Sequence, residues 1–216
     1  MKKNIFSLLV AILLCCVACE QDSTTYAIIE TEMGTMKVKL YDHTPKHRDN
    51  FIKLANEGFY NDLLFHRVIP SFMIQGGDPN SKGASPGAML GSGGPGYLID
   101  NEIGSIHVQG ALAAARTGGP QNPEKKSSGS QFYIVQGQPQ TEQSLDNWEK
   151  RKNIKYNEAQ RKKYIEKGGR PDLDMEYTVF GEVVEGFDVI SKIATVPTGR
   201  SNRPTTDVKM QVKLTN

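Results

Sequence analysis

The sequence predicts a mainly β fold, an antiparallel barrel or sandwich that carries two short helices. Short apolar runs alternate with period two, as in Thr35–Leu40 and Val208–Leu214, and turn-forming residues separate them. The length fits a single domain, because 216 residues with 38% hydrophobic side chains can supply one domain with its own core. Glycine is frequent, at 21 residues, which suits a chain with many turns.

The first predicted elements are a hairpin and a helix. Tyr26–Thr31 is apolar and β-prone, a turn follows at Met33-Gly34, and Thr35–Leu40 alternates so that one face is buried. The pair Thr44-Pro45 is typical of a helix start, with an N-cap followed by proline in the first position. Gly58 is the expected end of this helix.

The remaining strands are expected as short runs between loops. Residues 63–76 are apolar and strand-like, whereas residues 76–96 are so rich in Gly and Pro that we expect a long ordered loop. Gly181, inside a later run, indicates a bulge or a close backbone approach. The other expected elements are strands at Gly110–Ala115, Gln131–Val135, Tyr177–Val184 and Val208–Leu214, a polar loop at Thr117–Ser130 and a helix at Phe187–Ala194.

One charged segment, residues 141–170, interrupts the β pattern. It carries nine Lys or Arg and five Asp or Glu side chains. Asn157 and Gln160 have the spacing of a capping box, and Gly168-Gly169 would end a helix. We therefore expect one or two helices inserted into the β fold. Their surface is expected to be solvated, with a partner-binding or lipid-headgroup patch as the alternative.

The first eighteen residues are predicted to be a signal peptide rather than part of the fold. A basic start precedes a nearly unbroken apolar run, Ile5–Val17, whose 13 residues are too few to span a bilayer. Ala18 then precedes Cys19, which resembles a bacterial lipobox in which the cysteine is lipidated. This predicts a lipidated linker at 19–25 and a lipid-anchored protein of the bacterial cell envelope, on the periplasmic or outer-membrane face. Plain secretion is the alternative.

Composition and motifs exclude several functions. The net charge is +2, so no strong electrostatic field recruits nucleic acid. All three cysteines lie between Cys15 and Cys19, so residues 26–216 have no disulfide, no thiol nucleophile and no cysteine-based zinc site. The metalloprotease motif His-Glu-x-x-His and the Walker motif are absent. His43 and His47 are expected to be surface residues, because no carboxylate partner is evident in the sequence.

The most informative stretch is Phe65–Asp78 (FHRVIPSFMIQGGD). In a strand, Phe65, Arg67 and Ile69 would share one face. Arg67 thus lies in a run too apolar for an exposed surface. It is either a structural arginine in a buried salt bridge or a guanidinium held in an apolar cleft. The second case describes a site that binds a polar atom of an apolar ligand, without a nucleophile or a general base.

This stretch resembles the signature of the cyclophilins, the peptidyl-prolyl cis-trans isomerases. Two further blocks are similar to the family and follow in family order: residues 110–115 with 128–134 (GALAAA and SGSQFYI), and residues 177–186 (YTVFGEVVEG). The resemblance runs from Tyr26 to Leu214 and implies an eight-stranded antiparallel barrel capped by two helices, over residues 26–216. It implies isomerisation of X–Pro bonds in proline-containing polypeptides, with no cofactor, metal or covalent intermediate.

The resemblance also assigns site residues. Arg67 matches the catalytic arginine, and Ala115 with Arg116 matches the backbone segment that pairs with the substrate. Tyr177 stands where many members have histidine. Leu173, Met73, Phe72 and Tyr133 match the apolar pocket that receives proline, with Gln75 and Gln131 as polar residues that orient the substrate or the arginine. The resulting catalytic set is Arg67, Phe72 and Gln75.

Position 172 departs from the family. Asp172 falls where the family commonly has Trp or Phe, and the only tryptophan, Trp148, lies inside the 141–170 insertion. Weak cyclosporin binding is therefore expected. The insertion has the polarity and helix signals of an appended element, so we expect it to be dispensable for the chemistry. No sign of oligomerisation is present, so a monomer is expected. Two other functions stay open: a proline-peptide-binding chaperone without turnover, and an interaction lipoprotein that uses the insertion.

Overall fold

The computed structural model describes residues 24–215. The predicted signal peptide 1–18, Cys19 and most of the linker 19–25 therefore lie outside the described residues. The helices are α1 Pro45–Asn56, α2 Glu142–Lys152, α3 Glu158–Lys167 and α4 Phe187–Ala194, with short 3-10 turns η1 Pro79–Ser81, η2 Pro171–Leu173 and η3 Arg200–Asn202. The strands are β1 Tyr26–Thr31, β2 Gly34–Leu40, β3 Leu63–Leu64, β4 Arg67–Ile69, β5 Met73–Gly76, β6 Leu98–Ile99, β7 Ala111–Ala114, β8 Ser127–Ser128, β9 Phe132–Val135, β10 Val179–Glu185 and β11 Lys209–Thr215.

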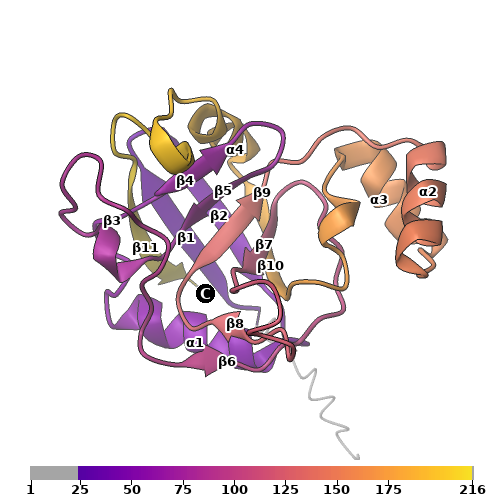
Figure 1. The fold of residues 1–216 in the computed structure, drawn as a ribbon, viewed down its shortest axis with the longest axis horizontal. Helices are drawn as coiled ribbons and strands as arrows, with labels where there is room; N and C mark the ends of the chain where they lie inside the picture. Colours follow the sequence, from indigo (N-terminus) through magenta and orange to yellow (C-terminus); the bar gives the residue numbers. More distant parts are fainter. Residues whose placement is uncertain (1–23, 216) are drawn as a thin grey trace, which may run out of the picture.

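Nine of these strands form one curled antiparallel sheet (Figure 1), in the order β3-β11-β1-β2-β10-β7-β9-β5-β4. The strands at its two ends, β3 and β4, are separated in the chain only by Phe65 and His66. The run Leu63–Ile69 thus begins at one edge of the sheet and ends at the other, which closes the sheet into a barrel. The expected eight strands become nine because this single run is divided at its centre.

The barrel is filled because alternate side chains of each strand point inward. Val68, Ile74 and Ile134 belong to the main buried cluster, as do Leu112 and Phe132. Phe65 also lies in this cluster, so the expectation that it shares a face with Arg67 is wrong. The reason is the break in the strand at Phe65 and His66, where the alternation is interrupted.

Two helices cover the ends of the barrel, α1 below and α4 above in Figure 1. Phe51 and Leu54 of α1 and Ile190 and Ile193 of α4 are buried in the main cluster. The expected start of α1 is confirmed, with Pro45 in its first turn, although the Thr44 side chain makes no capping hydrogen bond. Through these four side chains, the helices cover the apolar surface that the sheet leaves open at the two ends of the barrel.

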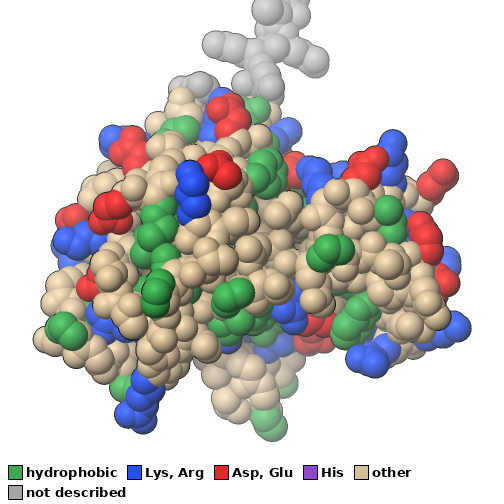
Figure 2. Space-filling view, turned by 90° about the horizontal axis from the view of Figure 1, so that it is seen from above, with side chains coloured by type: hydrophobic (Ala, Val, Ile, Leu, Met, Phe, Trp, Pro, Cys, Tyr) green, Lys and Arg blue, Asp and Glu red, His purple; other side chains and the backbone are tan. Residues whose placement is uncertain are grey.

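The segment 141–170 forms two helices, α2 and α3, that stand beside the barrel (Figure 1). Both begin with a capping box, and that of α3 pairs Asn157 with Gln160, as the sequence predicts. Leu145, Tyr156 and Tyr164 pack with Val108 in a small separate core. Figure 2 shows acidic and basic side chains interspersed over this lobe, in agreement with a solvated surface.

Other local expectations are confirmed. Residues 77–97 hold no strand and only the short turn η1, which fits a long ordered loop. At Gly181 the pairing of β10 with β7 changes register, and a Cβ there would lie 2.6 Å from the Lys39 carbonyl oxygen. His47 is a correction, because it is buried and its Nδ1 lies 2.6 Å from Glu102. In the described part of the chain, no helix is long and apolar enough to cross a bilayer.

Candidate active site

The candidate site is built on a row of residues that crosses three neighbouring strands. Arg67 of β4 is the register partner of Gln75 of β5, and Gln75 is the partner of Tyr133 of β9. Residues paired across antiparallel strands project from the same face of the sheet. Since Val68, Ile74 and Ile134 fill the barrel, their neighbours Arg67, Gln75 and Tyr133 face outward.

A second apolar cluster covers this outer face. Met73, Tyr133, Leu173 and Val179 are buried in it, and Phe72 packs against it. Beside the cluster lies a small cavity of about 110 Å³. Its lining residues are Arg67, Phe72, Met73, Gln75, Ala115, Arg116, Tyr133, Leu173 and Tyr177. The fold thus brings together nine of the ten residues that the family resemblance assigns to the site.

The tenth residue, Gln131, does not line the small cavity but holds Arg67 through Gln75. Arg67 Nη1 donates a hydrogen bond to Gln75 Oε1 (3.1 Å), and Gln75 Nε2 donates to Gln131 Oε1 (3.1 Å). Gln131 Nε2 in turn donates to the carbonyl oxygen of Gly93 (2.7 Å) in the 76–96 loop. Two neutral amides therefore hold the guanidinium in place, and the loop anchors them.

Arg67 is a half-buried cation without an anionic partner. Within the described residues, no carboxylate oxygen lies within 4.0 Å of its guanidinium. Burial lowers the pKa of Arg67, but an arginine keeps its proton in proteins. Its N–H groups are therefore charged donors that no carboxylate neutralises, beside an apolar cavity. The alternative of a structural salt bridge for Arg67 is wrong.

The rim of the cavity carries two further arginines, and both have carboxylate partners. Arg116 Nη2 lies 2.9 Å from Glu176 Oε2, and its guanidinium covers the ring of Tyr177 at 4.7 Å. Arg170 Nη2 lies 2.7 Å from Asp172 Oδ2, and its guanidinium lies 4.1 Å from the centre of the Phe72 ring. These pairs fix the aromatic walls of the cavity.

Trp148 of α2 does not supply the aromatic ring that is missing at position 172. Trp148 does not line the small cavity, and its ring is covered by Arg151 at 4.7 Å. Asp172 and Arg170 occupy the rim near Phe72 instead. The position where the family commonly has an aromatic ring thus carries an ion pair in this chain.

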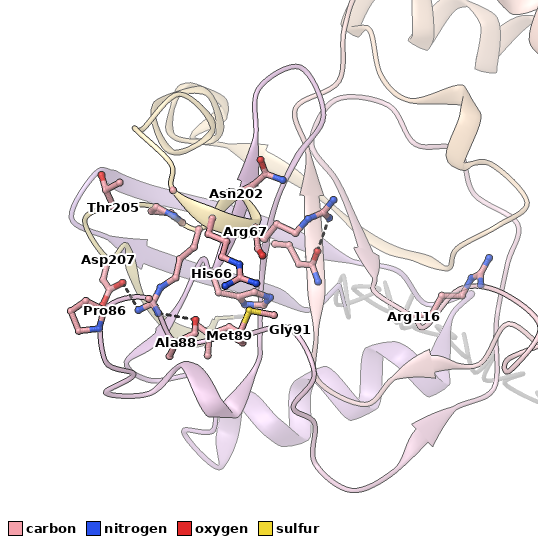
Figure 3. A pocket seen from close by; sticks show the side chains of 18 residues that line it. His66, Arg67, Pro86, Ala88, Met89, Gly91, Arg116, Asn202, Thr205 and Asp207 are labelled. Atoms are coloured by element: carbon pink, nitrogen blue, oxygen red, sulfur yellow. Dashed lines mark hydrogen bonds and ion pairs between the residues drawn. The ribbon is translucent and has the colours of Figure 1, made fainter.

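A larger cavity of about 740 Å³ lies on the other side of Arg67. Figure 3 shows Arg67 and His66 beside it, between the loop around Ala88 and Met89 and the segment around Asn202. Arg203 fastens these two segments, because its guanidinium donates to the carbonyl oxygens of Ser85 and Ala88 and pairs with Asp207. Arg67 therefore lines two neighbouring hollows.

Sequence reasoning missed the residues behind Tyr133. The Tyr133 hydroxyl lies 3.0 Å from His107 Nε2, and His107 Nδ1 lies 2.8 Å from Asp174 Oδ1. The phenol oxygens of Tyr156 and Tyr164, both in the insertion, each lie 2.6 Å from Asp174 Oδ2. The signal in the sequence that could have indicated this network is the pair Tyr156 and Tyr164, since a charged segment that is fully solvated rarely carries large aromatic side chains.

The family model described as cyclophilin type peptidyl-prolyl cis-trans isomerase matches residues 26–213. The chain belongs to the cyclophilin-type peptidyl-prolyl cis-trans isomerase family. A Staphylococcus epidermidis protein named as a peptidyl-prolyl cis-trans isomerase is 33% identical over 192 residues, which cover 88% of this chain and 91% of the relative.

A second relative is longer than this cyclophilin. A Streptococcus pyogenes protein, named as a bifunctional phosphatase and peptidyl-prolyl cis-trans isomerase, is 38% identical over 187 residues. The match covers 83% of this chain but only 36% of that relative, so its phosphatase activity is not carried over.

Solved structures confirm the fold. A Cryptosporidium parvum cyclophilin type peptidyl-prolyl cis-trans isomerase has a TM-score of 0.66 and 24% identity, covering 89% of this chain and 98% of its own. A second structure of that protein, in the presence of the dipeptide Ala-Pro, has a TM-score of 0.64 and 25% identity, covering 88% and 99%. The predicted mainly β cyclophilin fold and the predicted enzyme class are thus confirmed, while the individual residue roles stay predictions.

Proposed function

We propose that this cyclophilin isomerises X–Pro bonds by donating a hydrogen bond from Arg67 to the proline nitrogen of the twisted amide. Rotation about the bond costs ~18–20 kcal/mol because amide resonance is lost. As the amide twists, the nitrogen regains a lone pair and becomes an acceptor that the planar amide does not offer. A donor aimed at it stabilises the transition state more than the ground state.

The observation that carries this proposal is the charge of Arg67. Its guanidinium has no carboxylate within 4.0 Å among the described residues, and neutral amides brace it beside an apolar cavity. A partner carboxylate would compete for the same N–H groups. The walls made by Phe72, Met73 and Leu173 offer the proline ring an apolar seat, while the preceding carbonyl rotates.

The main chain beside the cavity supports the binding of an extended peptide. Ala115 is already paired, since its N–H donates to the Gln131 carbonyl oxygen and its own carbonyl accepts from Ser128. The neighbouring Arg116 makes no main-chain hydrogen bond within residues 24–215. Its N–H and carbonyl are therefore open to a substrate strand, while its side chain is held by Glu176.

The decisive experiment is an isomerase assay on an Ala-Pro peptide with Arg67→Ala. Removing one preorganised donor should lower kcat/KM by about 10²–10³-fold while thermal unfolding stays cooperative. Arg48→Ala is the matched control, because Arg48 lies in α1 and pairs with Asp42 and Asp49. Near-native turnover by a folded Arg67→Ala variant would contradict the mechanism. A wild-type protein that binds the peptide without turnover would be the chaperone instead.

We further propose that the protein acts on exported polypeptides at the bacterial envelope, held there by lipid on Cys19. The support is the apolar run Ile5–Val17 followed by Ala18-Cys19. Cys19→Ser should abolish the lipid-dependent increase in mature mass and shift the protein out of the membrane fraction. Cys15→Ser, in the segment to be removed, is the control and should behave as wild type. An unchanged mass and fractionation for Cys19→Ser would disprove the anchor.

A further inference from the structure

Tyr133 lines the small cavity with its ring, yet its hydroxyl is turned away from it. The side chain is only 5% exposed, and its phenol oxygen lies 3.0 Å from His107 Nε2. The rings of Tyr133 and His107 are stacked, with centroids 6.1 Å apart. Because the hydroxyl has a partner behind the wall, the cavity meets only the apolar ring.

His107 is itself fixed by a carboxylate. It is fully buried, and Asp174 Oδ1 lies 2.8 Å from both its Nδ1 and its main-chain nitrogen. A carboxylate accepts, so Nδ1 carries the hydrogen and donates it to Asp174. In the neutral ring Nε2 is then the acceptor, and the Tyr133 hydroxyl donates to it. The direction of each hydrogen bond in this pair follows from Asp174.

Asp174 is in turn held by the insertion. The hydroxyl groups of Tyr156 and Tyr164 both donate to Asp174 Oδ2 at 2.6 Å, and both rings are buried. Burial, together with the charge of Asp174, raises the pKa of both phenols, so both remain donors at neutral pH. Lys152 of α2 adds a hydrogen bond to the Asp174 carbonyl oxygen (2.7 Å). Asp174 also follows Leu173, another wall of the cavity.

We propose that Tyr156 and Tyr164 are positioning residues for the proline-binding cavity, acting through Asp174 and His107 on the Tyr133 ring. The inference rests on the proposed isomerase function and deepens it. A Tyr133 hydroxyl deprived of its acceptor would have to find another, and the open direction is the cavity itself. A polar group would then enter a seat that suits an apolar ring. The insertion thereby sets how well the cavity accepts proline.

A double-mutant cycle tests this chain of contacts. Tyr164→Phe should raise KM for an Ala-Pro peptide about fivefold with little change in kcat, because Arg67 and Gln75 lie on strands outside the network. Tyr133→Phe removes the hydroxyl that would turn into the cavity, so in this background Tyr164→Phe should change KM by less than about twofold. Two residues that act independently would instead give the same fivefold rise in both backgrounds. Gln160→Ala, which weakens the capping box of α3 without touching the network, is the control and should keep the wild-type KM.

A second readout does not depend on turnover. With ¹⁵N-labelled histidine, His107 should show the Nδ1–H tautomer, and its Nε2 signal should shift when the Ala-Pro peptide is added. Tyr133→Phe should abolish that response, and Tyr164→Phe should displace the Nδ1–H signal. Additive effects on KM, or a His107 signal indifferent to Tyr164→Phe, would overturn the proposal. If the wild type lacks turnover, the proposed function fails, and the same cycle measured on peptide dissociation constants still decides the positioning role.

Discussion

At the scale of single residues, the site depends on leaving one charge without a counter-ion. Arg116, Arg170 and Arg203 each lie within 3.0 Å of a carboxylate, whereas Arg67 is braced by the amide of Gln75. An amide oxygen orients a guanidinium without neutralising it. Glutamine at position 75 therefore matters because it is uncharged, and not only because of its size.

Gln75→Glu is the sharpest test of that consequence. The change keeps the size of the side chain but places a carboxylate about 3 Å from the Arg67 guanidinium, where it would form a charge-assisted pair. It also removes the Nε2 donor to Gln131 Oε1. We expect kcat/KM to fall by about 10- to 100-fold, because the N–H groups are then engaged, while the midpoint of thermal unfolding changes little, because the new ion pair offsets the lost hydrogen bond. Gln143→Glu adds the same charge on the surface of α2 and should leave both quantities unchanged. A fully active Gln75→Glu enzyme would show that Arg67 needs no free donors.

At the scale of elements, the strands position the residues of the site, and the insertion holds the residues behind one wall of the cavity. The strands β4, β5 and β9 place Arg67, Gln75 and Tyr133 in one row. The insertion adds nothing to that row but supplies the donors that hold Asp174. Its removal should therefore affect how the proline ring is seated more than the donor that acts on the nitrogen.

Replacing residues 141–170 by a short Gly-Ser linker tests this division. The barrel should still fold, because loop length itself costs only ~0.6 kcal/mol per doubling. Turnover on a short peptide should stay within about tenfold of wild type, equivalent to ~1.4 kcal/mol of barrier, and the loss should lie in KM. Steady-state kinetics on the replaced and intact proteins provide the measurement. A folded barrel without any activity would mean that the insertion belongs to the active site itself.

At the scale of the whole molecule, two buried histidines link stability to pH. His47 is 2% exposed and His66 is 3% exposed. Burial lowers the pKa of each below its usual value, although Glu102 opposes this at His47. Both imidazoles therefore bind protons less readily in the folded than in the unfolded chain. Their contribution is fully present above pH 6.5 and is lost as the pH falls towards the lowered values.

Acidification from about pH 6.5 to pH 5 should therefore destabilise the fold. The free energy of unfolding should fall by up to ~1.4 kcal/mol per pH unit for each histidine, because each unfolded chain gains a proton there. Denaturant unfolding at several pH values measures the slope. His66→Phe should flatten it, whereas His43→Gln, at an exposed position, should not. A slope unaffected by His66→Phe would show that His66 is protonated equally in both states.

The sequence by itself determined the β pattern, the helix limits and Arg67 as a candidate residue in an apolar run. Alternation places Arg67 and Gln75 on strands, and capping signals such as Asn157 with Gln160 are local, so each can be read from a few neighbouring residues. Family resemblance added the roles of Phe72, Met73 and Tyr133, which now stand around one cavity. These features depend on short-range chemistry and on the order of motifs.

Only the tertiary structure decided contacts between residues far apart in the chain. The buried His47 pairs with Glu102, which lies 55 residues further along the chain. The break at Phe65 divides one expected strand into two. Asp174 joins His107 to Tyr164 through hydrogen bonds that span 67 and 10 residues. Such pairs follow from how the barrel closes and how the insertion packs against it. No periodicity or local propensity specifies them, because each donor is satisfied by an acceptor that only folding brings near.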